Sequence, residues 1–476
     1  MTSSFSRVAI TKELAGDLDT PVSVYLKLSQ HMDAHGSFLL ESVTGGDKIA
    51  RYSFLGFNPF CEFKANGHDI VIRHNHHLQT SSGNPIDALQ AVLSQQVLLL
   101  DNLDIPALVG GAIGYFSWES IAHIEPIVFR HSIPPIHTPL AHFVFPSLMV
   151  IFDHAKRKMI LIALCKPGNE SDGTLLLQSI EKILQTPLAT GSLIPVPGPA
   201  PDTLFDHVLS NFSKDHFMDT VKRAKNHVFE GDIFQLLLSQ KFQIPQSKSP
   251  LDIYRALRLI NPSPYMFFMN FGSYQLAGSS PEILVKLENK KATVRPIAGT
   301  RPRILGQEKA LSEELLKDEK ERSEHIMLVD LGRNDLGRVC QSGSITVEKL
   351  MEVETYSHVL HIASHITGIL DNQKTAFDLF KATFPAGTLS GTPKIKAIKL
   401  IDQLEPDPRG NYAGALGYFD LHGNMDLCIM IRTALIQNGM CTVQAGAGIV
   451  ADSDPETEFY ESRNKAKGIL HACMCE

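Results

Sequence analysis

The sequence predicts an α+β fold built around a largely antiparallel β-sheet. Two apolar runs, Leu148–Phe152 and Met159–Leu164, flank a charged turn at 153–158, and this pattern is typical of an antiparallel hairpin. Strand-like runs occur in groups instead of alternating strictly with helices, which favours α+β over a parallel α/β architecture. A third observation is a full set of helix start signals at Asp454, which predicts a terminal helix.

The other elements can be placed in order beyond residue 201. The pattern predicts a helix at 214–230, a strand at 232–243, a helix at 250–259, a series of strands to about 300 and one long helix over 308–331. In the terminal helix, Asp454 caps the first turn and Pro455 fits inside it. Glu456 and Glu458 suit the positive end of its dipole.

A composition shift divides the chain. Proline and glycine recur without periodicity from Thr186 to Pro201, which is typical of a linker. We therefore expect a linker at 186–203 between an N-terminal region at 1–185 and a C-terminal region at 204–476. A chain of 476 residues is long enough for two or three domains' worth of core.

Composition also narrows the class of protein. The sequence is 43% hydrophobic and 20% charged, which is ordinary for a globular chain, and its formal charge of -7 argues against a nucleic-acid partner. Apolar runs are too short for a signal peptide or a bilayer span, so no membrane partner is expected. Seven cysteines without a disulfide-framework spacing fit reduced thiols. We therefore expect a cytoplasmic protein.

Two Glu-x-x-Glu pairs indicate a metal site. They are Glu321 with Glu324, and Glu458 with Glu461. Residues three apart on a helix share a face, so each pair directs two carboxylates the same way. Solvated helix faces can carry the same pattern. If the two helices face each other, however, four carboxylates would surround a hard cation, and all-oxygen ligation suits Mg2+ shared with an anionic substrate.

Two glycine-rich segments match nucleotide-binding patterns only in part. The segment 446–451 follows a strand, but too little sequence remains after it for a βαβ unit. The segment 387–394 has one residue too few between its glycines, and Pro393 precedes the lysine, so a phosphate loop and a phosphotransferase are disfavoured. Both segments still offer backbone N–H groups suited to a carboxylate.

Four motifs give the chain a family resemblance. They are Arg-Pro-Ile-Ala-Gly-Thr-Arg-Pro-Arg at 295–303, Glu-His-Ile-Met-Leu-Val-Asp-Leu-Gly-Arg-Asn-Asp-Leu at 324–336, Pro-Ala-Gly-Thr-Leu-Ser-Gly at 385–391 and Gln-Ala-Gly-Ala-Gly at 444–448. Together they closely resemble the chorismate-utilising enzymes, and within them the anthranilate synthase large-subunit family. The resemblance is dense from about 210 to 470 and extends to Leu39–Ser42 and Arg51–Gly56.

The resemblance implies a fold and a division of labour. The expected fold has two large, mostly antiparallel β-sheets packed face to face, with helices outside. Region 1–185 would contain regulatory elements, and region 204–476 would be the chorismate-binding catalytic region.

The resemblance also implies a reaction. Ammonia adds at C2 of chorismate as the C4 hydroxyl leaves, and pyruvate is then eliminated to give anthranilate, in the first step of tryptophan biosynthesis. Glu282 matches the family's general acid, and His361 matches the histidine linked to pyruvate elimination, with Thr388 alongside.

The binding residues follow by the same resemblance. Glu324 and Glu461 would bind Mg2+ directly, with Glu321 and Glu458 behind them through water. The implied substrate-binding residues are Thr300, Gly387, Tyr412, Arg432, Gly446, Gly448 and Lys465.

Two positions bear on the nucleophile. Gln235 stands where relatives that add water have a lysine base, and a neutral amide cannot deprotonate water. Ala298 stands where aminodeoxychorismate synthases have a nucleophilic lysine. Both favour ammonia at C2, while aminodeoxychorismate synthase component I and a non-catalytic tryptophan-sensing subunit are the alternatives. Thr392 departs from the family pattern, which usually has alanine there.

Partners and regulation complete the expectation. No Gly-x-Cys-x-Gly nucleophile surrounds any cysteine, so a separate glutamine amidotransferase subunit would supply ammonia, in a heterotetramer of two large and two small subunits. Segments that resemble tryptophan-binding elements imply feedback inhibition by L-tryptophan. Their residues are Glu41, Ser42, Asn261, Pro262, Ser263, Pro264, Tyr265 and Met266.

Overall fold

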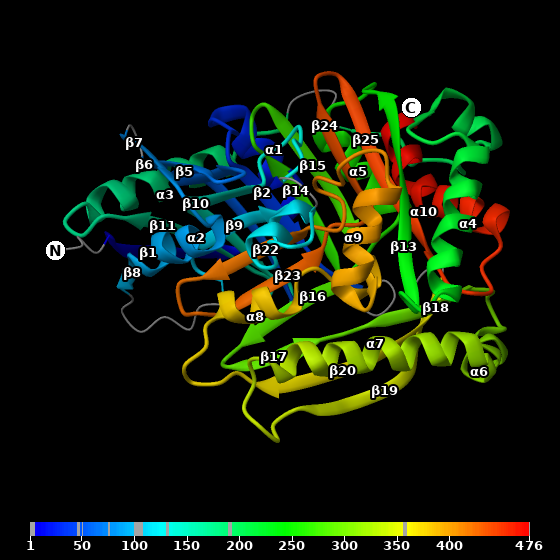
Figure 1. Ribbon diagram of the computed structural model, residues 1–476. Coiled ribbons are helices and arrows are strands. Elements are labelled where there is room, and N and C mark those ends of the chain that lie inside the picture. Colours follow the sequence, from blue (N-terminus) through cyan, green and yellow to red (C-terminus); the bar gives the residue numbers. More distant parts are fainter. Residues whose placement is uncertain are drawn as a thin grey trace.

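Two long strands, β5 (Tyr52–Asn66) and β10 (Ala141–Asp153), join the two sheets of the molecule (Figure 1). They pair antiparallel along their length, and the register shifts between Phe145 and Pro146. On either side of this irregularity each strand has different neighbours, so one half belongs to each sheet. The computed structural model describes residues 5–44, 48–49, 51–74, 77–99, 108–129, 133–188, 193–355 and 359–475.

The first sheet contains the N-terminal half of β5 and the C-terminal half of β10. Its hydrogen-bonded order is β8 (Gln96–Leu99), β1 (Phe5–Ala15), β11 (Lys158–Cys165), β10, β5, β2 (Ser37–Glu41), β14 (Tyr265–Asn270), β15 (Tyr274–Ser280), β24 (Thr433–Gln437), β25 (Met440–Ile449), β13 (Gln235–Pro245) and β12 (Leu209–Ser210). The short β21 (Gly391–Thr392) pairs with the start of β13. Among the described strands, only β1 and β8 pair in parallel.

The second sheet contains the other halves of β5 and β10. Its order is β7 (His77–Ser82), β6 (Asp69–His74), β5, β10, β9 (Gly111–Phe116), β22 (Ala415–Asp420), β23 (Met425–Ile429), β16 (Ile283–Glu288), β17 (Lys291–Val294) and β20 (Val359–Ile369). Strands β18 (Ile297–Pro302) and β19 (Thr346–Thr355) also pair with β20. A separate two-stranded ladder joins β3 (Val43–Thr44) and β4 (Lys48–Ile49).

The sheets pack face to face. One buried cluster combines Phe267 and Ile151 of the first sheet with Ile113 and Leu416 of the second. Helices cover the outer faces. One large cluster of buried residues joins the first sheet to α1 (Pro21–His31), α3 (Glu170–Leu184), α5 (Pro250–Ile260) and α10 (Pro455–Met474). A second large cluster of buried residues contains side chains of α2 (Pro85–Ser94), α4 (Lys214–Phe229), α8 (Ala376–Thr383) and α9 (Lys394–Leu404). The expected fold class is confirmed.

The predicted long helix at 308–331 is wrong in one respect. It is two helices, α6 (Glu308–Lys317) and α7 (Glu319–Gly337), which break at Asp318. The Asp318 carboxylate accepts a hydrogen bond from the Glu321 N–H at 3.2 Å and from Arg301 at 2.8 Å. Asp318 therefore acts as a cap for α7, and its extended backbone ends α6.

The other helix predictions agree with the structure. Helices α4 and α5 occupy the expected ranges, and Asp454 caps α10 by accepting a hydrogen bond from the Thr457 N–H at 2.9 Å. The described part of the expected linker, 187–188 and 193–201, contains no helix or strand. Strands from both sides of it nevertheless share the sheets, through the pairs β2–β14 and β9–β22. The division into an N-terminal and a C-terminal region stays a prediction.

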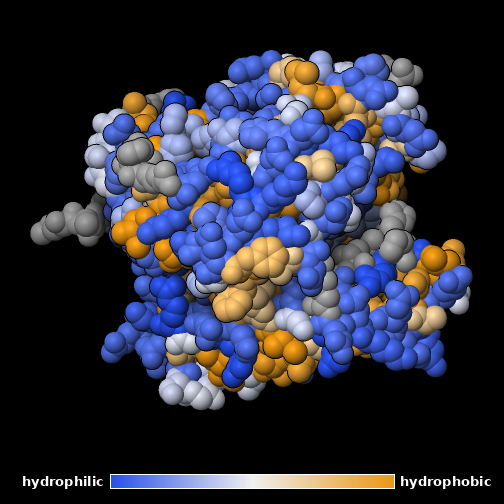
Figure 2. All heavy atoms as spheres, turned by 45° about the vertical axis from the view of Figure 1, so that its right-hand side comes forward, coloured by the Kyte–Doolittle hydropathy of each residue, from blue (hydrophilic) through white to orange (hydrophobic). Residues whose placement is uncertain are grey.

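Three further features concern the surface, the helices and the thiols. The face seen in Figure 2 is mainly hydrophilic, with separate hydrophobic patches. In the described part of the chain, no helix is both long and apolar enough to span a bilayer. All seven cysteines are free.

Candidate active site

Glu282 lies between β15 and β16, where the chain passes from the first sheet to the second. Only 7% of the residue is exposed, and burial raises the pKa of its carboxyl to about 7. The hydrogen bond that Thr388 Oγ1 donates to Glu282 Oε1 at 3.0 Å lowers this pKa and so partly offsets the effect of burial. Because the threonine donates to Oε1, the acidic proton resides on Oε2, from which it can be given to a substrate.

Three cations lie around this acid. Lys465, Arg295 and Arg432 all act electrostatically on Glu282, and the same three act on His361. Lys465 lies in α10, Arg295 in the loop before β18 and Arg432 in the loop before β24, while His361 lies in strand β20. The fold therefore brings an acid, a histidine and three positive charges into one site, which suits a dianionic substrate.

His361 is a buried, neutral base. Burial, followed by the charge of Arg432, lowers the pKa of His361 to about 4, so its imidazole is uncharged at neutral pH. The Gly299 carbonyl lies 3.1 Å from Nδ1 and can only accept, so we assign the ring proton to Nδ1. That tautomer leaves the basic lone pair on Nε2.

Arg432 and Tyr412 lie at the same site. Burial lowers the pKa of Arg432, and the Glu282 charge partly offsets that effect. Glu282 also acts electrostatically on the buried phenol of Tyr412. Arg432 adopts a left-handed backbone conformation, with φ of 50°, and donates from NH1 to Asn261 Oδ1 at 3.2 Å. A half-buried guanidinium of this kind is well suited to bind a substrate carboxylate.

The predicted glycines lie at close contacts. A Cβ at Gly387 would clash with Leu331 of α7, and a Cβ at Gly446 would lie 2.4 Å from the Leu238 carbonyl oxygen. At Gly448 the added atom would lie 2.8 Å from Gln235 Nε2. The absence of side chains therefore lets α7, β13 and β25 approach the site closely.

Helix α7 places the two carboxylates of the first predicted metal pair against different strands, Glu324 against β13 and Glu321 against β18. Glu324 Oε1 accepts a hydrogen bond from Gln235 Nε2 at 2.8 Å. Glu321 Oε1 accepts one from Arg301 NH1 at 3.1 Å. Since Gln235 also lies against Gly448, Glu324 lies close to the end of the β13–β25 pair.

Helix α10 presents the second pair to the same strands. Glu461 Oε1 lies 2.7 Å from Lys465 Nζ, which also donates to the Gly446 carbonyl at 3.1 Å. Glu458, one helical turn earlier, is 6% exposed. The structure therefore places Glu324, and through Lys465 also Glu461, near the β13–β25 pair, while no three of the four carboxylates have ligand atoms within 4.8 Å of one another. Carboxylate oxygens are the donors that Mg2+ prefers. A bound cation would replace Lys465 as the partner of Glu461 and Arg301 as the partner of Glu321.

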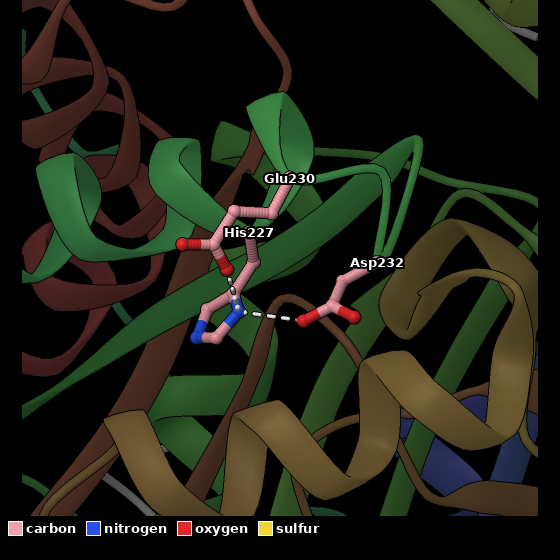
Figure 3. A group of neighbouring side chains, drawn as sticks. All are labelled: His227, Glu230 and Asp232. Carbon is pink, nitrogen blue, oxygen red and sulfur yellow. Dashed lines mark hydrogen bonds and ion pairs between the residues drawn. The ribbon is translucent and has the colours of Figure 1, made fainter.

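A different group has the tightest metal-like spacing among the described residues. His227, Glu230 and Asp232 place one ligand atom each within 4.8 Å of one another, between the end of α4 and α9 (Figure 3). His227 Nδ1 lies 2.9 Å from Asp232 Oδ2, and Lys396 Nζ lies 2.9 Å from Asp232 Oδ1. The lysine already neutralises the carboxylate, so we interpret this group as a salt-bridge cluster.

Thr300 is placed only in part. Its backbone lies opposite His361 in the β18–β20 register, but its side chain is outside the described part of the structure. Arg295 and Asp335 line the pocket beside Glu282 and Thr388, and neither was among the predicted site residues. Both lie in motifs of the family resemblance, at 295–303 and 324–336, so these motifs were the available signal. Arg295 pairs with Glu354.

The two predicted tryptophan-binding elements lie side by side. Glu41 pairs with Met266 across β2 and β14, and the Val43 N–H donates to the Ser263 carbonyl at 3.2 Å. Both segments bring polar groups that already have partners: Glu41 binds Arg258 at 2.8 Å, and the Asn261 amide binds Arg432 and Ser279. Ser42, Pro262, Pro264 and Tyr265 lie in or beside these segments, and tryptophan binding stays a prediction.

Comparisons with known proteins cover almost the whole chain. The model of the family described as "chorismate binding enzyme" matches residues 35–471. The chain is 41% identical to anthranilate synthase component 1 of Acetivibrio thermocellus, covering 99% of this chain and 96% of the relative. It is 42% identical to the protein of the same name from Synechocystis sp., covering 98% and 96%.

Solved structures agree with the fold. Anthranilate synthase component I from Streptococcus pneumoniae superposes with a TM-score of 0.78 at 37% identity, covering 96% of this chain and 98% of that one. A menaquinone-specific isochorismate synthase from Escherichia coli superposes with a TM-score of 0.72 at 20% identity, covering 98% and 95%, and supports the fold alone.

Proposed function

This chain belongs to the chorismate binding enzyme family, and from that premise we propose that it is the ammonia-using component of an anthranilate synthase. The proposed reaction converts chorismate and ammonia to anthranilate, pyruvate and water, as the first step of tryptophan biosynthesis. The observation that supports it best is the shared site of Glu282, Thr388 and His361 among three cations.

The acid step uses Glu282. With a pKa of about 7, its carboxyl keeps a proton at neutral pH that an exposed glutamate would lose. The proton on Oε2 passes to the C4 hydroxyl, which leaves as water while the C2–N bond forms and the ring double bond shifts. Thr388 fixes the orientation of the carboxyl through its bond to Oε1.

The elimination step uses His361. Its neutral imidazole, held by the Gly299 carbonyl, has a lone pair at Nε2 that can accept a proton. Loss of the C2 proton and cleavage of the C3–O bond expel the enolpyruvyl group, which takes up a proton and departs as pyruvate. The ring becomes aromatic, which makes this step favourable.

Binding of the two substrate carboxylates falls to cations and backbone. Arg432 and Lys465 offer charge, and Gly446 and Gly448 let the backbone of β25 approach. We propose that Glu324 and Glu461, with Glu321 and Glu458, hold Mg2+. When bound, Mg2+ would draw electron density toward the ring carboxylate as a Lewis acid.

Gln235 supports ammonia as the nucleophile. Its amide donates to Glu324 and cannot act as a base toward water, whereas ammonia needs no base to attack. The name "component 1" of the relatives agrees with a second component that would release ammonia from glutamine. A heterotetramer, a cytoplasmic location and feedback inhibition by tryptophan remain parts of this proposal.

Product analysis tests the proposal. Purified chain is incubated with chorismate, Mg2+ and ammonium at alkaline pH, and products are identified by mass spectrometry. Anthranilate and pyruvate in equal amounts are expected. The 4-amino isomer would instead support an aminodeoxychorismate synthase, and no consumption of chorismate would support a non-catalytic subunit.

A further inference from the structure

We propose that Arg409 is a positioning residue, which holds the turn that presents Thr388 to Glu282. This inference rests on the proposed function, because it concerns the same site. Arg409 follows α9, is 4% exposed, and has no role in the reaction steps described above.

The guanidinium joins two parts of the site through backbone oxygens. NH1 donates to the Leu389 carbonyl at 2.7 Å, and NH2 donates to the Leu237 carbonyl at 2.8 Å. Leu389 ends the turn η3 (Gly387–Leu389) and directly follows Thr388. Leu237 lies in β13, opposite Gly448. One side chain therefore ties the catalytic turn to β13, the strand that pairs with the predicted carboxylate-binding backbone of β25.

Glu405 fixes the guanidinium in turn. Arg409 Nε lies 2.8 Å from Glu405 Oε2, and NH2 lies 2.7 Å from Oε1, so the pair is bidentate. The same Oε1 accepts hydrogen bonds from the Ser239 N–H at 2.8 Å and from its hydroxyl at 2.7 Å. Ser239 lies in β13, opposite Gly446. The pair is thus anchored on the same strand that it holds against the turn.

Two aromatic rings close the arrangement. The Arg409 guanidinium carbon lies 4.4 Å from the centroid of the Trp118 ring and 5.6 Å from that of Tyr412. Such contacts restrict the guanidinium to one plane. A lysine has no planar fork, so it could not reach Glu405, Leu389 and Leu237 together.

The consequence is specific to the acid. If the η3 turn moves, Thr388 loses its bond to Glu282 Oε1, and the acid loses both its orientation and an interaction that stabilises its charged form. Arg409 contacts neither Arg432 nor Lys465, and its 5.6 Å approach to the Tyr412 ring involves no hydrogen bond, so chorismate affinity should change less than turnover. Misplacement of a catalytic group by about 1 Å can reduce turnover by about 100-fold.

The experiment is a double-mutant cycle of Arg409→Lys and Thr388→Val, with ammonia held at constant free-base concentration at each pH. We expect Arg409→Lys to lower kcat by roughly 10- to 100-fold, with a smaller change in KM for chorismate. The alkaline limb of the pH profile of Arg409→Lys should move to higher pH, as in Thr388→Val. In the Thr388→Val background, Arg409→Lys should have much less effect, because the interaction it supports is already absent.

Arg7→Lys is the matched control. Arg7 is also 4% exposed and stacks on a ring, with its guanidinium carbon 4.1 Å from the Phe60 centroid, but it lies in β1. The Arg7→Lys variant should have a lower Tm than the wild type, with the alkaline limb of the pH profile unmoved. If Arg409→Lys does not fold, Glu405→Gln replaces it in the cycle, since it keeps the volume and weakens the anchor.

Three results would overturn the proposal: an unmoved pH limb in Arg409→Lys, an equal loss of turnover in both Thr388 backgrounds, or failure of both the Arg409 and Glu405 variants to fold. The cycle is measured as consumption of chorismate as well as formation of anthranilate. A wild-type protein that makes another product from chorismate would therefore refute the proposed function and still test the role of Arg409.

Discussion

Replacement of Thr388 by valine should raise the pKa of Glu282 and move the pH profile with it. Thr388 Oγ1 donates to Glu282 Oε1 at 3.0 Å, and this bond stabilises the carboxylate form. Valine keeps the shape of threonine and removes the donor. A hydrogen bond to a charged group contributes about 1.5–3 kcal/mol, which corresponds to a rise of about 1 to 2 pH units from the present value.

The sign follows from the role of the acid. Glu282 acts in its protonated form, so activity falls as pH rises through its pKa of about 7. A higher pKa in Thr388→Val therefore displaces the alkaline limb of kcat/KM for chorismate to higher pH, while loss of orientation lowers the plateau. The assay follows anthranilate fluorescence from pH 6 to about 9.5 at constant free ammonia, a range chosen to span the limb before and after the shift.

Thr383→Val is the control for this change. Thr383 lines the same pocket, but its hydroxyl donates to the Leu379 carbonyl of its own helix at 3.0 Å. It should leave the limb in place. A limb that stays fixed in Thr388→Val, or moves to lower pH, would refute the assignment of Glu282 as the acid held by Thr388.

Three further predictions concern the acid, the metal and the regulator. Folding raises the pKa of Glu282 from 4.5 to about 7, so its contribution to stability is fully present below pH 4.5 and is lost as pH rises to about 7. Between pH 4.5 and 8 the free energy of unfolding of Glu282→Gln should therefore rise by about 3 kcal/mol relative to that of the wild type, as measured by denaturant unfolding. Glu461→Gln should raise the Mg2+ concentration for half-maximal activity by roughly 10- to 100-fold, while Glu456→Gln, on the same helix but paired with Lys214, should not. Ser42→Ala should raise the tryptophan concentration for half-inhibition by about tenfold with basal activity unchanged, and unchanged inhibition would contradict the site.

Local signals in the sequence predicted helices α4, α5 and α10. Asp454 and Pro455 mark the start of α10 because capping and proline geometry are properties of neighbouring residues. The break at Asp318 was missed although Asp318 and Glu321 have the spacing of a helix start signal, because good helix formers on both sides continue the pattern. The second partner of the Asp318 carboxylate, Arg301 of strand β18, reaches it only in the folded chain and could not be predicted from neighbouring residues.

The connection between the two sheets could not be predicted either, because it depends on the pairing of distant strands. The hairpin of β10 and β11 was visible as two apolar runs around a charged turn. The sharing of β5 and β10 between two sheets depends on which distant strands pair with each half, and periodicity carries no such information. The fold class was therefore predictable, while the connection between the sheets was not.

The site was predictable only through the family resemblance. Glu282 and Thr388 are 106 residues apart, and nothing in the spacing indicates that they share a hydrogen bond. Residues that act through other residues gave no signal: Arg409 reaches the site through backbone carbonyls, which any residue provides. Gln235 was singled out as a missing base, and its contact with Glu324 became evident only in the structure.

The central claim, that one site performs amination and elimination with separate groups, is tested most directly by His361→Ala. The variant and wild type are mixed with chorismate, Mg2+ and 15N-ammonium, quenched at intervals and analysed by mass spectrometry, with His365→Ala on the same strand as the control. We predict that His361→Ala accumulates aminodeoxyisochorismate, the labelled ring compound that retains its enolpyruvyl group, while wild type and His365→Ala release anthranilate and pyruvate. Anthranilate formation by His361→Ala at the wild-type rate, or equal loss of both steps, would contradict the account.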